Sequence, residues 1–194
     1  MRYLIDPHNI TDFNRDIADL EAFWLFCILV AGKNSRIQAQ KLAEFLDQPG
    51  HWSTPFSLIR NMFSNNELSE LVEDAKLGQY SRVIRAFTES LNLNLHTCTV
   101  NELESVYGVG PKTARLFLLH SRPNQRFAVI DTYLLKWLHN TLGVDVPKAT
   151  PSNPDKYREL EQHYLNYCDQ YNLSPAELDL HIWSKFNIER FGEV

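Results

Sequence analysis

Apolar residues recur along this chain at the spacing of an α-helix almost throughout, and no stretch shows convincing period-two alternation. Residues 20–31 are apolar on all faces, which is typical of a helix buried at the centre of a domain. The apolar run at 127–130 is too short to establish a strand. We therefore expect an all-α protein with helices over 20–31, 36–46, 54–63, 66–75, 80–91, 99–106, 111–120, from 132 onward, over 155–171 and over 175–188.

Two short helices near the middle of the chain are joined by a turn that contains Gly108 and Gly110. Thr99 and Glu102 have the spacing of a capping box, which starts the first helix. Gly110 can cap the second helix, and Pro111 suits its first position, where no amide donor is needed. The glycines permit left-handed backbone and the close approach of another molecule, and the amides at the start of the second helix suit a phosphate. The pattern resembles the helix-hairpin-helix motif that binds a DNA backbone.

The charge of the chain is unevenly distributed. Its 194 residues are enough for one compact unit or two small lobes, and its formal charge of −5 argues weakly against a nucleic-acid partner. The segment 112–148 is locally basic, however, whereas the segments 6–21 and 155–193 are acidic. Because the distribution matters more than the sum, a nucleic-acid partner stays open.

Several kinds of site and segment are not indicated by the sequence. Cys27, Cys98 and Cys168 are about seventy residues apart, too far for the spacing of a zinc or iron–sulfur site. Nucleotide-binding fingerprints and paired-histidine motifs are absent, so we expect no cofactor. The run at 22–31 is half the length of a membrane span, and no signal peptide is evident. We expect a monomer that binds no membrane and is cytoplasmic, or nuclear if the host is eukaryotic.

Lys112 stands at the start of the second helix of the pair, where a cation is mildly unfavourable. A helix N-terminus carries roughly half a unit of positive charge. That charge favours the neutral form of the amine, and a neutral amine can act as a nucleophile. Lys112 is therefore a candidate catalytic residue, and an ordinary phosphate contact is the alternative.

The stretch 106–138 resembles the signature of the helix-hairpin-helix (HhH-GPD) base-excision DNA glycosylases, the superfamily of endonuclease III and 8-oxoguanine DNA glycosylase. That signature places Gly-Val-Gly-x-Lys-x-Ala ahead of a Val-Asp-Thr or Val-Asp-Val. The residues that fall in register are Gly108, Val109, Gly110, Lys112, Ala114 and Asp131, with Thr113 and Thr132 matching the endonuclease III form. Tyr107 stands where the family usually has a proline.

The resemblance implies a two-lobed helical fold with its helix-hairpin-helix over 99–120. One lobe is expected over about 21–140, and the second from about 1–20 together with 150–194. Because the chain lacks the cysteine cluster of most endonuclease III proteins, it is closest in character to the cluster-free 8-oxoguanine enzymes.

The resemblance also assigns roles to single residues. Lys112 would be the nucleophile, and Asp131 the carboxylate that stabilises the cationic sugar or moves a proton. Asp131 alone would equally suit the N-cap of the next helix. The residues expected to bind the DNA backbone are Gly108, Val109, Gly110 and Thr113. The backbone carbonyls expected to hold a monovalent cation are those of Glu104, Val106 and Val109.

Two further pairs of residues follow from the resemblance. Lys33 or Asn34 would fill the gap left by an extruded base, and a solvated helix end is the alternative. Asp179 and Trp183 lie four residues apart on one face of the last helix, so that they resemble the base-reading and base-stacking pair of 8-oxoguanine glycosylases. A carboxylate only accepts hydrogen bonds, which suits the two adjacent donors of a guanine-type base. The alternatives are a core tryptophan and a solvated charge.

The expected function is that of a bifunctional DNA glycosylase and AP lyase in base excision repair. It would remove an oxidised base, 8-oxoguanine first of all, from duplex DNA through a lysine Schiff base. Two other functions stay open, namely an oxidised-pyrimidine glycosylase like endonuclease III and a non-catalytic helix-hairpin-helix module that binds damaged DNA.

Overall fold

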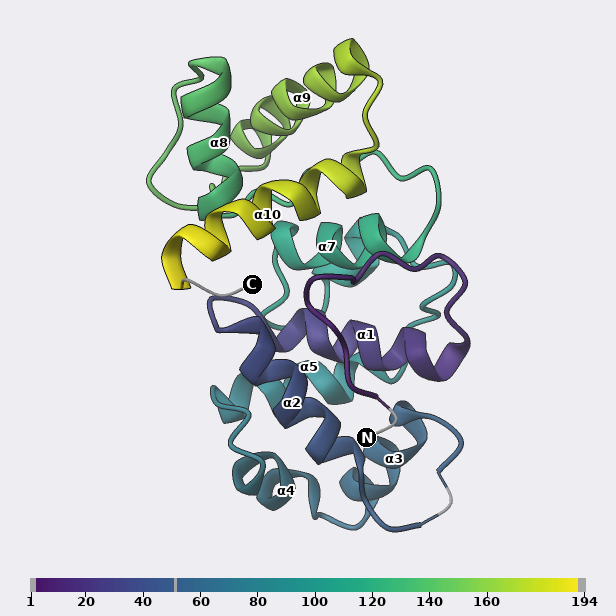
Figure 1. The fold of residues 1–194 in the computed structure, drawn as a ribbon. Helices are drawn as coiled ribbons and strands as arrows, with labels where there is room; N and C mark the ends of the chain where they lie inside the picture. Colours follow the sequence, from purple (N-terminus) through teal and green to yellow (C-terminus); the bar gives the residue numbers. More distant parts are fainter. Residues whose placement is uncertain (1–2, 51, 192–194) are drawn as a thin grey trace. The chain divides into compact units, whose positions relative to one another are not determined.

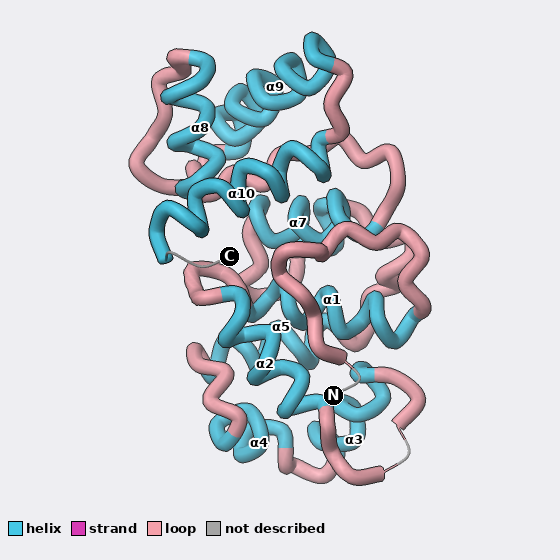
Figure 2. The backbone as a smooth tube through the Cα atoms, viewed as in Figure 1, coloured by secondary structure: helices cyan, strands magenta, loops and turns pink. Residues whose placement is uncertain are grey.

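The structure, a computed structural model, describes the backbone of residues 3–50 and 52–191, and side chains as far as residue 186. Within these residues the chain forms ten α-helices and no strand (Figures 1 and 2). The helices are α1 (Ile17–Leu29), α2 (Ser35–Leu46), α3 (Pro55–Ser64), α4 (Leu68–Asp74), α5 (Tyr80–Ser90), α6 (Val100–Glu104), α7 (Pro111–Ser121), α8 (Thr132–Leu142), α9 (Pro154–Tyr171) and α10 (Pro175–Phe191). The all-α prediction and every expected helix are confirmed. None of the helices in the described part of the chain is long and apolar enough to cross a membrane.

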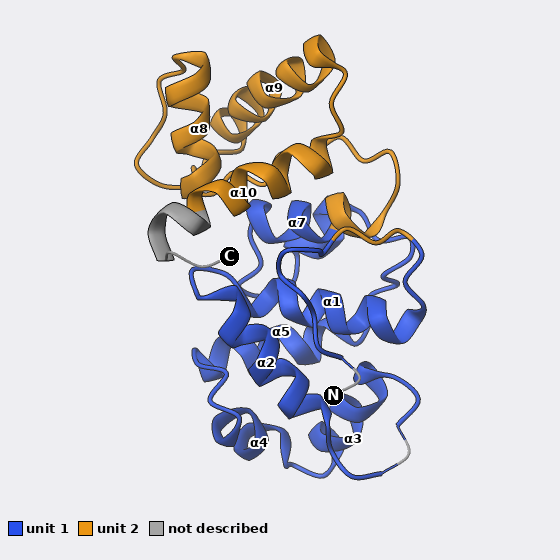
Figure 3. Ribbon diagram, viewed as in Figure 1, with its two compact units in different colours: residues 1–10, 14–117 blue, residues 11–13, 118–194 orange. Residues whose placement is uncertain are grey.

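The chain divides into two compact units, and the boundary falls inside α7 (Figure 3). Unit 1 comprises residues 1–10 and 14–117, and unit 2 comprises residues 11–13 and 118–194. The segment 118–140 thus groups with the C-terminal helices, whereas it was expected in the lobe over 21–140. The physical reason is the apolar face of α8, which packs on α9 and α10.

The core of unit 1 is built around α1, which is buried along nearly its whole length. Helices α2, α3 and α5 pack against it. The indole of Trp24 donates a hydrogen bond to Ser90 Oγ (2.8 Å) at the end of α5, and its ring meets the edge of Phe117 on α7 at 5.1 Å between centroids. The C-terminal end of α5 and the middle of α7 therefore both contact the same buried helix.

The core of unit 2 is formed by α8, α9 and α10, which pack against one another in pairs. Leu134 and Leu138 of α8 are buried in one cluster with Tyr157 and Tyr164 of α9 and with Ile182 of α10. Because these apolar positions recur at helical spacing, each helix turns one stripe inward.

Candidate DNA-binding and catalytic site

The helix-hairpin-helix forms as predicted, with a first helix shorter than expected. Thr99 caps α6 through a capping box with Glu102, in which Thr99 Oγ1 accepts the Glu102 amide (3.3 Å) and Glu102 Oε2 accepts the Thr99 amide (2.7 Å). α6 ends at Glu104, and Val109 N–H then donates to Val106 O (3.0 Å) to close the turn. The turn leads directly into α7, which begins at Pro111.

The two glycines of the hairpin have different surroundings. Gly108 has φ of +73° and lies against the side chain of Arg82, so that an added Cβ would stand 2.6 Å from Arg82 Cγ. Arg82 donates to Gly108 O (3.3 Å) and to Ile28 O at the end of α1 (3.1 Å). Gly110 has no atom within 4 Å of an added Cβ and no left-handed backbone. Gly108 is therefore required by the fold, whereas Gly110 leaves room for another molecule.

Tyr107, at the position where the family that the sequence resembles usually has a proline, uses the amide that a proline would lack. Its N–H donates to Glu89 Oε2 (2.6 Å), and the Arg85 guanidinium lies 4.1 Å from the centre of its ring. The hydrogen bond from the Tyr107 amide, followed by that from Arg85, lowers the pKa of the Glu89 carboxyl. Tyr107 therefore connects the hairpin to α5 through Glu89 and Arg85.

Lys112 is half-buried in the first turn of α7, and Thr113 beside it is buried. Burial raises the pKa of the Cys27 thiol above its ordinary range, while the positive charges of Arg15 and Lys112 act in the opposite direction. The ammonium of Lys112 is thus close enough to a fully buried residue of α1 to affect its ionisation. Lys112 is thus partly shielded from solvent, and partial desolvation is one way in which a lysine is activated as a nucleophile.

Three cations cluster beside the hairpin on unit 1, namely Lys33, Lys41 and Arg82. Lys33 Nζ donates to Leu77 O (2.6 Å), and Lys41 Nζ donates to Lys76 O (2.6 Å). Burial lowers the pKa of Lys33, and the charges of Arg82 and Lys41 lower it further. This concentration of positive charge favours an anion such as a phosphate.

Lys33 and Asn34, predicted to fill the gap left by an extruded base, both bond within unit 1. Lys33 is half-buried rather than solvated. Asn34 is exposed and caps α2, its side chain accepting the amide of Ile37 (3.0 Å). The gap-filling role of these two residues stays a prediction.

The carbonyls predicted to hold a monovalent cation belong to the hairpin turn. Val106 O accepts one amide, that of Val109, and a carbonyl oxygen has two lone pairs. Val106 O therefore keeps a lone pair for a cation, and the cation site formed with Glu104 and Val109 stays a prediction. No group of three or more acidic, histidine or cysteine side chains that could hold a metal occurs in the part of the chain that the structure describes.

Asp131 is the N-cap of α8 in unit 2. Its Oδ1 accepts the amides of Tyr133 (2.8 Å) and Leu134 (2.9 Å). The capping interpretation of Asp131 is confirmed. A catalytic role is compatible with capping, because the hydrogen bonds to the helix amides also fix the orientation of the carboxylate.

The segment that leads to Asp131 has no regular secondary structure and is held by side chains of unit 2. The hydroxyl of Tyr157, which is buried, donates to Ala128 O (2.8 Å) and accepts Ile130 N–H (3.1 Å). Thr150 Oγ1 donates to Ile130 O (2.7 Å). Both polar groups of the residue before Asp131 are thus bonded, which fixes the position of the carboxylate.

Asp179 and Trp183 lie on α10, also in unit 2. Asp179 is only 9% exposed, so it is not a solvated charge, and its Oδ2 lies 3.1 Å from Nε2 of His120. Trp183, four residues further on, is half-buried. One turn after Trp183, the ring of Phe186 stacks on that of Tyr133 near the start of α8 (5.8 Å between centroids, 6° between planes). Unit 2 therefore brings the helix of the base-pocket candidates against the helix that Asp131 caps.

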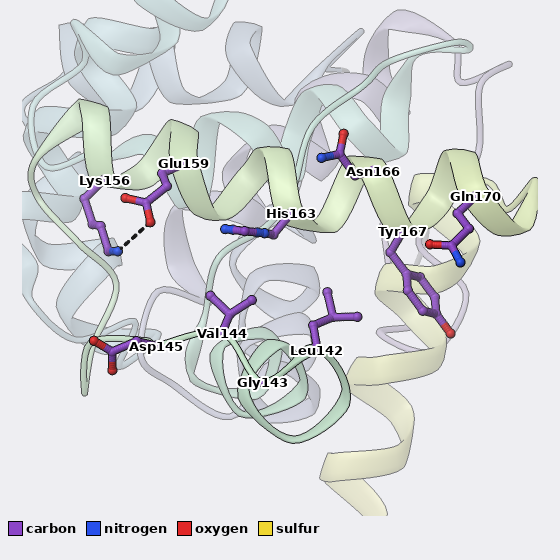
Figure 4. Close-up of a pocket in the computed structure, with 10 residues that line it drawn as sticks. All are labelled: Leu142, Gly143, Val144, Asp145, Lys156, Glu159, His163, Asn166, Tyr167 and Gln170. Atoms are coloured by element: carbon purple, nitrogen blue, oxygen red, sulfur yellow. Dashed lines mark hydrogen bonds and ion pairs between the residues drawn. The ribbon is translucent and has the colours of Figure 1, made fainter.

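An open cavity of about 620 Å³ on unit 2 is not part of this site (Figure 4). It lies between α9 and the loop after α8, where Lys156 pairs with Glu159 (2.9 Å) near His163. None of the residues predicted from the sequence lines it.

Two residues that contact site candidates were not predicted, namely Arg82 beside Gly108 in unit 1 and His120 beside Asp179 in unit 2. Histidine was expected to be mostly exposed, which holds for the five others within the described residues, at positions 8, 96, 139, 163 and 181, while residue 51 lies outside them. His120 is fully buried. Its place in the apolar run of α7 was the one signal that could have identified it.

Comparisons with known proteins agree with this architecture. No family model matches the chain. The crystal structure of 8-oxoguanine DNA glycosylase from Methanocaldococcus jannaschii is similar over 100% of this chain and 86% of that one, with a TM-score of 0.64 and 21% identity. The structure of the same organism's 8-oxoguanine glycosylase/lyase in complex with a 15-mer DNA containing 8-oxoguanine is similar over 96% and 89%, with a TM-score of 0.66 and 22% identity. The chain therefore shares the all-helical fold of these two structures, which is the fold class expected from the sequence.

Proposed function

We propose that the protein is a bifunctional DNA glycosylase and AP lyase that removes 8-oxoguanine from duplex DNA. The observation that carries the proposal is the hairpin: a left-handed Gly108, an open Gly110 and then a half-buried lysine in the first turn of α7. The similarity in fold to two 8-oxoguanine glycosylase structures supports the same conclusion.

DNA would be bound through its backbone at the hairpin. The amides at the start of α7 and the open space beside Gly110 suit a phosphate. The cations of Lys33, Lys41 and Arg82 add a sequence-independent attraction that falls as salt rises. The hairpin would thus hold the duplex while one nucleotide is extruded.

Lys112 would then carry out the chemistry. Its neutral Nζ forms a bond to C1′ of the damaged nucleotide while the bond from C1′ to the base breaks, and the base leaves with a proton. Loss of a proton from Nζ and opening of the sugar ring give an imine. Removal of a C2′ proton expels the 3′ phosphate and cuts the strand. Asp131 would stabilise the cationic sugar and move protons.

The base would be chosen by Asp179 and Trp183. A carboxylate accepts from the adjacent N1–H and N2–H₂ donors of an oxidised guanine, and thymine glycol lacks this pair. Asp179→Ala should therefore lower release of 8-oxoguanine far more than cleavage at a pre-formed abasic site, where no base is recognised. Equal loss on both substrates, or no loss on either, would contradict the assignment.

A panel of duplexes, each with one lesion, tests the proposed function. Base release and strand cleavage are measured in single turnover on 8-oxoguanine, thymine glycol and abasic duplexes. We expect release of 8-oxoguanine accompanied by a nick. Preferred release of thymine glycol would identify an oxidised-pyrimidine glycosylase, and salt-sensitive binding with no release from any lesion would identify a binding module.

A further inference from the structure

A chain of three polar side chains runs through unit 2 and ends at the base-pocket carboxylate. Thr11 Oγ1 lies 2.7 Å from Nδ1 of His120, and Nε2 of His120 lies 3.1 Å from Oδ2 of Asp179. The imidazole has no exposed surface, and Asp179 is nearly buried. The carboxylate is thus held by a residue that the proposed chemistry does not use.

The direction of these hydrogen bonds follows from the chemistry of the groups. An ionised carboxylate can only accept, so the proton between His120 and Asp179 belongs to Nε2. In a neutral ring, Nδ1 then accepts from the hydroxyl of Thr11, and in a charged ring it donates to that hydroxyl. In both states Nε2–H is aimed at Asp179, because the bond at the other nitrogen fixes the orientation of the ring.

The contact with His120 involves only Oδ2 of the Asp179 carboxylate. Within the part of the chain that the structure describes, Oδ1 of Asp179 makes no hydrogen bond. A carboxylate whose Oδ2 is held by His120 cannot rotate freely, so Oδ1 points in one fixed direction. Trp183 lies four residues further along α10, on the same face of the helix as Asp179.

We infer that His120 is a positioning residue for base recognition: it holds Asp179 so that Oδ1 accepts from the donor edge of an oxidised guanine, and Thr11 holds His120. The inference rests on the proposed function. The stability of the fold does not by itself explain the buried pair of His120 and Asp179, because buried ion pairs can often be replaced by apolar residues of similar size without loss of stability. Pre-organisation of a recognition group is what the pair adds.

Two substitutions separate the two hydrogen bonds of the ring. The amide nitrogen of glutamine can reach the place of Nε2, so His120→Gln keeps the bond to Asp179. The shorter asparagine reaches only the place of Nδ1, so His120→Asn keeps the bond to Thr11 and loses that to Asp179. Both variants bury an amide in the same cavity, and each is therefore the control for the other.

Each variant is assayed in single turnover on an 8-oxoguanine duplex and on an abasic duplex, with thermal unfolding in parallel. We expect His120→Asn to release 8-oxoguanine at least about tenfold more slowly, as for loss of a hydrogen bond to a charged group. Cleavage of the abasic duplex should stay within about twofold, and His120→Gln should stay within about threefold of the wild type on both substrates.

The possible outcomes separate the inference from the function on which it rests. If the wild type releases 8-oxoguanine and both variants match it, or both lose the two activities equally, the positioning role is wrong while the function stands. If the wild type releases no base from any duplex, the proposed function fails and the inference fails with it.

Discussion

Gly108→Ala tests how the hairpin is built. The residue has φ of +73°, and a methyl group would stand 2.6 Å from Cγ and 2.7 Å from Cδ of Arg82, closer than carbon atoms approach. Arg82 would have to move, and its hydrogen bonds to Gly108 O and Ile28 O would weaken or break.

The magnitude follows from these two effects. Left-handed backbone costs alanine about 1–2 kcal/mol, and loss of the Arg82 bonds, which are partly exposed, costs about 1 kcal/mol more. A total of about 2–3 kcal/mol should lower the Tm by roughly 5–10 °C in a chain of this size.

Gly110→Ala is the matched control, because its added methyl would meet no atom within 4 Å. We expect it to cost no more than about 1 kcal/mol, because alanine is a poorer N-cap than glycine but meets no clash and no left-handed backbone here. Its methyl would occupy the space where a phosphate is expected, so affinity for duplex DNA should fall instead. Thermal unfolding and fluorescence anisotropy with a labelled duplex measure the two effects. Equal Tm values for the two variants would refute the reasoning about Gly108.

Three other predictions concern single side chains. Asp131→Asn should slow base release by about a hundredfold or more without changing the Tm, because asparagine caps a helix as well as aspartate does. Asp16→Asn, at the N-cap of α1, is the control. Similar rates of base release for the two variants would contradict a catalytic role of Asp131. Tyr157→Phe leaves the buried amide of Ile130 without its hydroxyl partner and should cost about 1–3 kcal/mol in urea unfolding; an unchanged free energy would count against this role. Burial raises the pKa of the Glu21 carboxyl, so the stability it contributes is complete below the unfolded-state pKa and is lost as pH rises through the higher folded-state pKa. The Tm of the wild type should therefore fall relative to that of Glu21→Gln as the pH rises above the ordinary glutamate pKa of about 4, and parallel curves would exclude this effect.

The features that could be predicted from the sequence depend on neighbours within a few positions. The capping box of Thr99 and Glu102 and the cap at Asp131 each join residues two or three apart, and both form as expected. Helix positions followed from the same local pattern of apolar residues. Short-range chemistry therefore accounts for the helices and for the order of the site residues along the chain.

The features that could not be predicted depend on how distant helices pack. Arg82 reaches Gly108 across 26 positions, and His120 reaches Asp179 across 59. Neither contact has a local pattern that would indicate it, because each is set by the packing of distant parts of the chain rather than by spacing. The burial of Asp179 depends on the packing of unit 2 in the same way.

Covalent trapping tests the central claim most directly. The native protein is incubated with an 8-oxoguanine duplex in the presence of borohydride, and the attached residue is identified by peptide mass spectrometry. The proposed mechanism predicts a reduced adduct on Lys112, lost in Lys112→Gln and kept in Lys148→Gln, the control at an exposed lysine. Base release without an adduct, or an adduct on another lysine, would show that Lys112 is not the nucleophile.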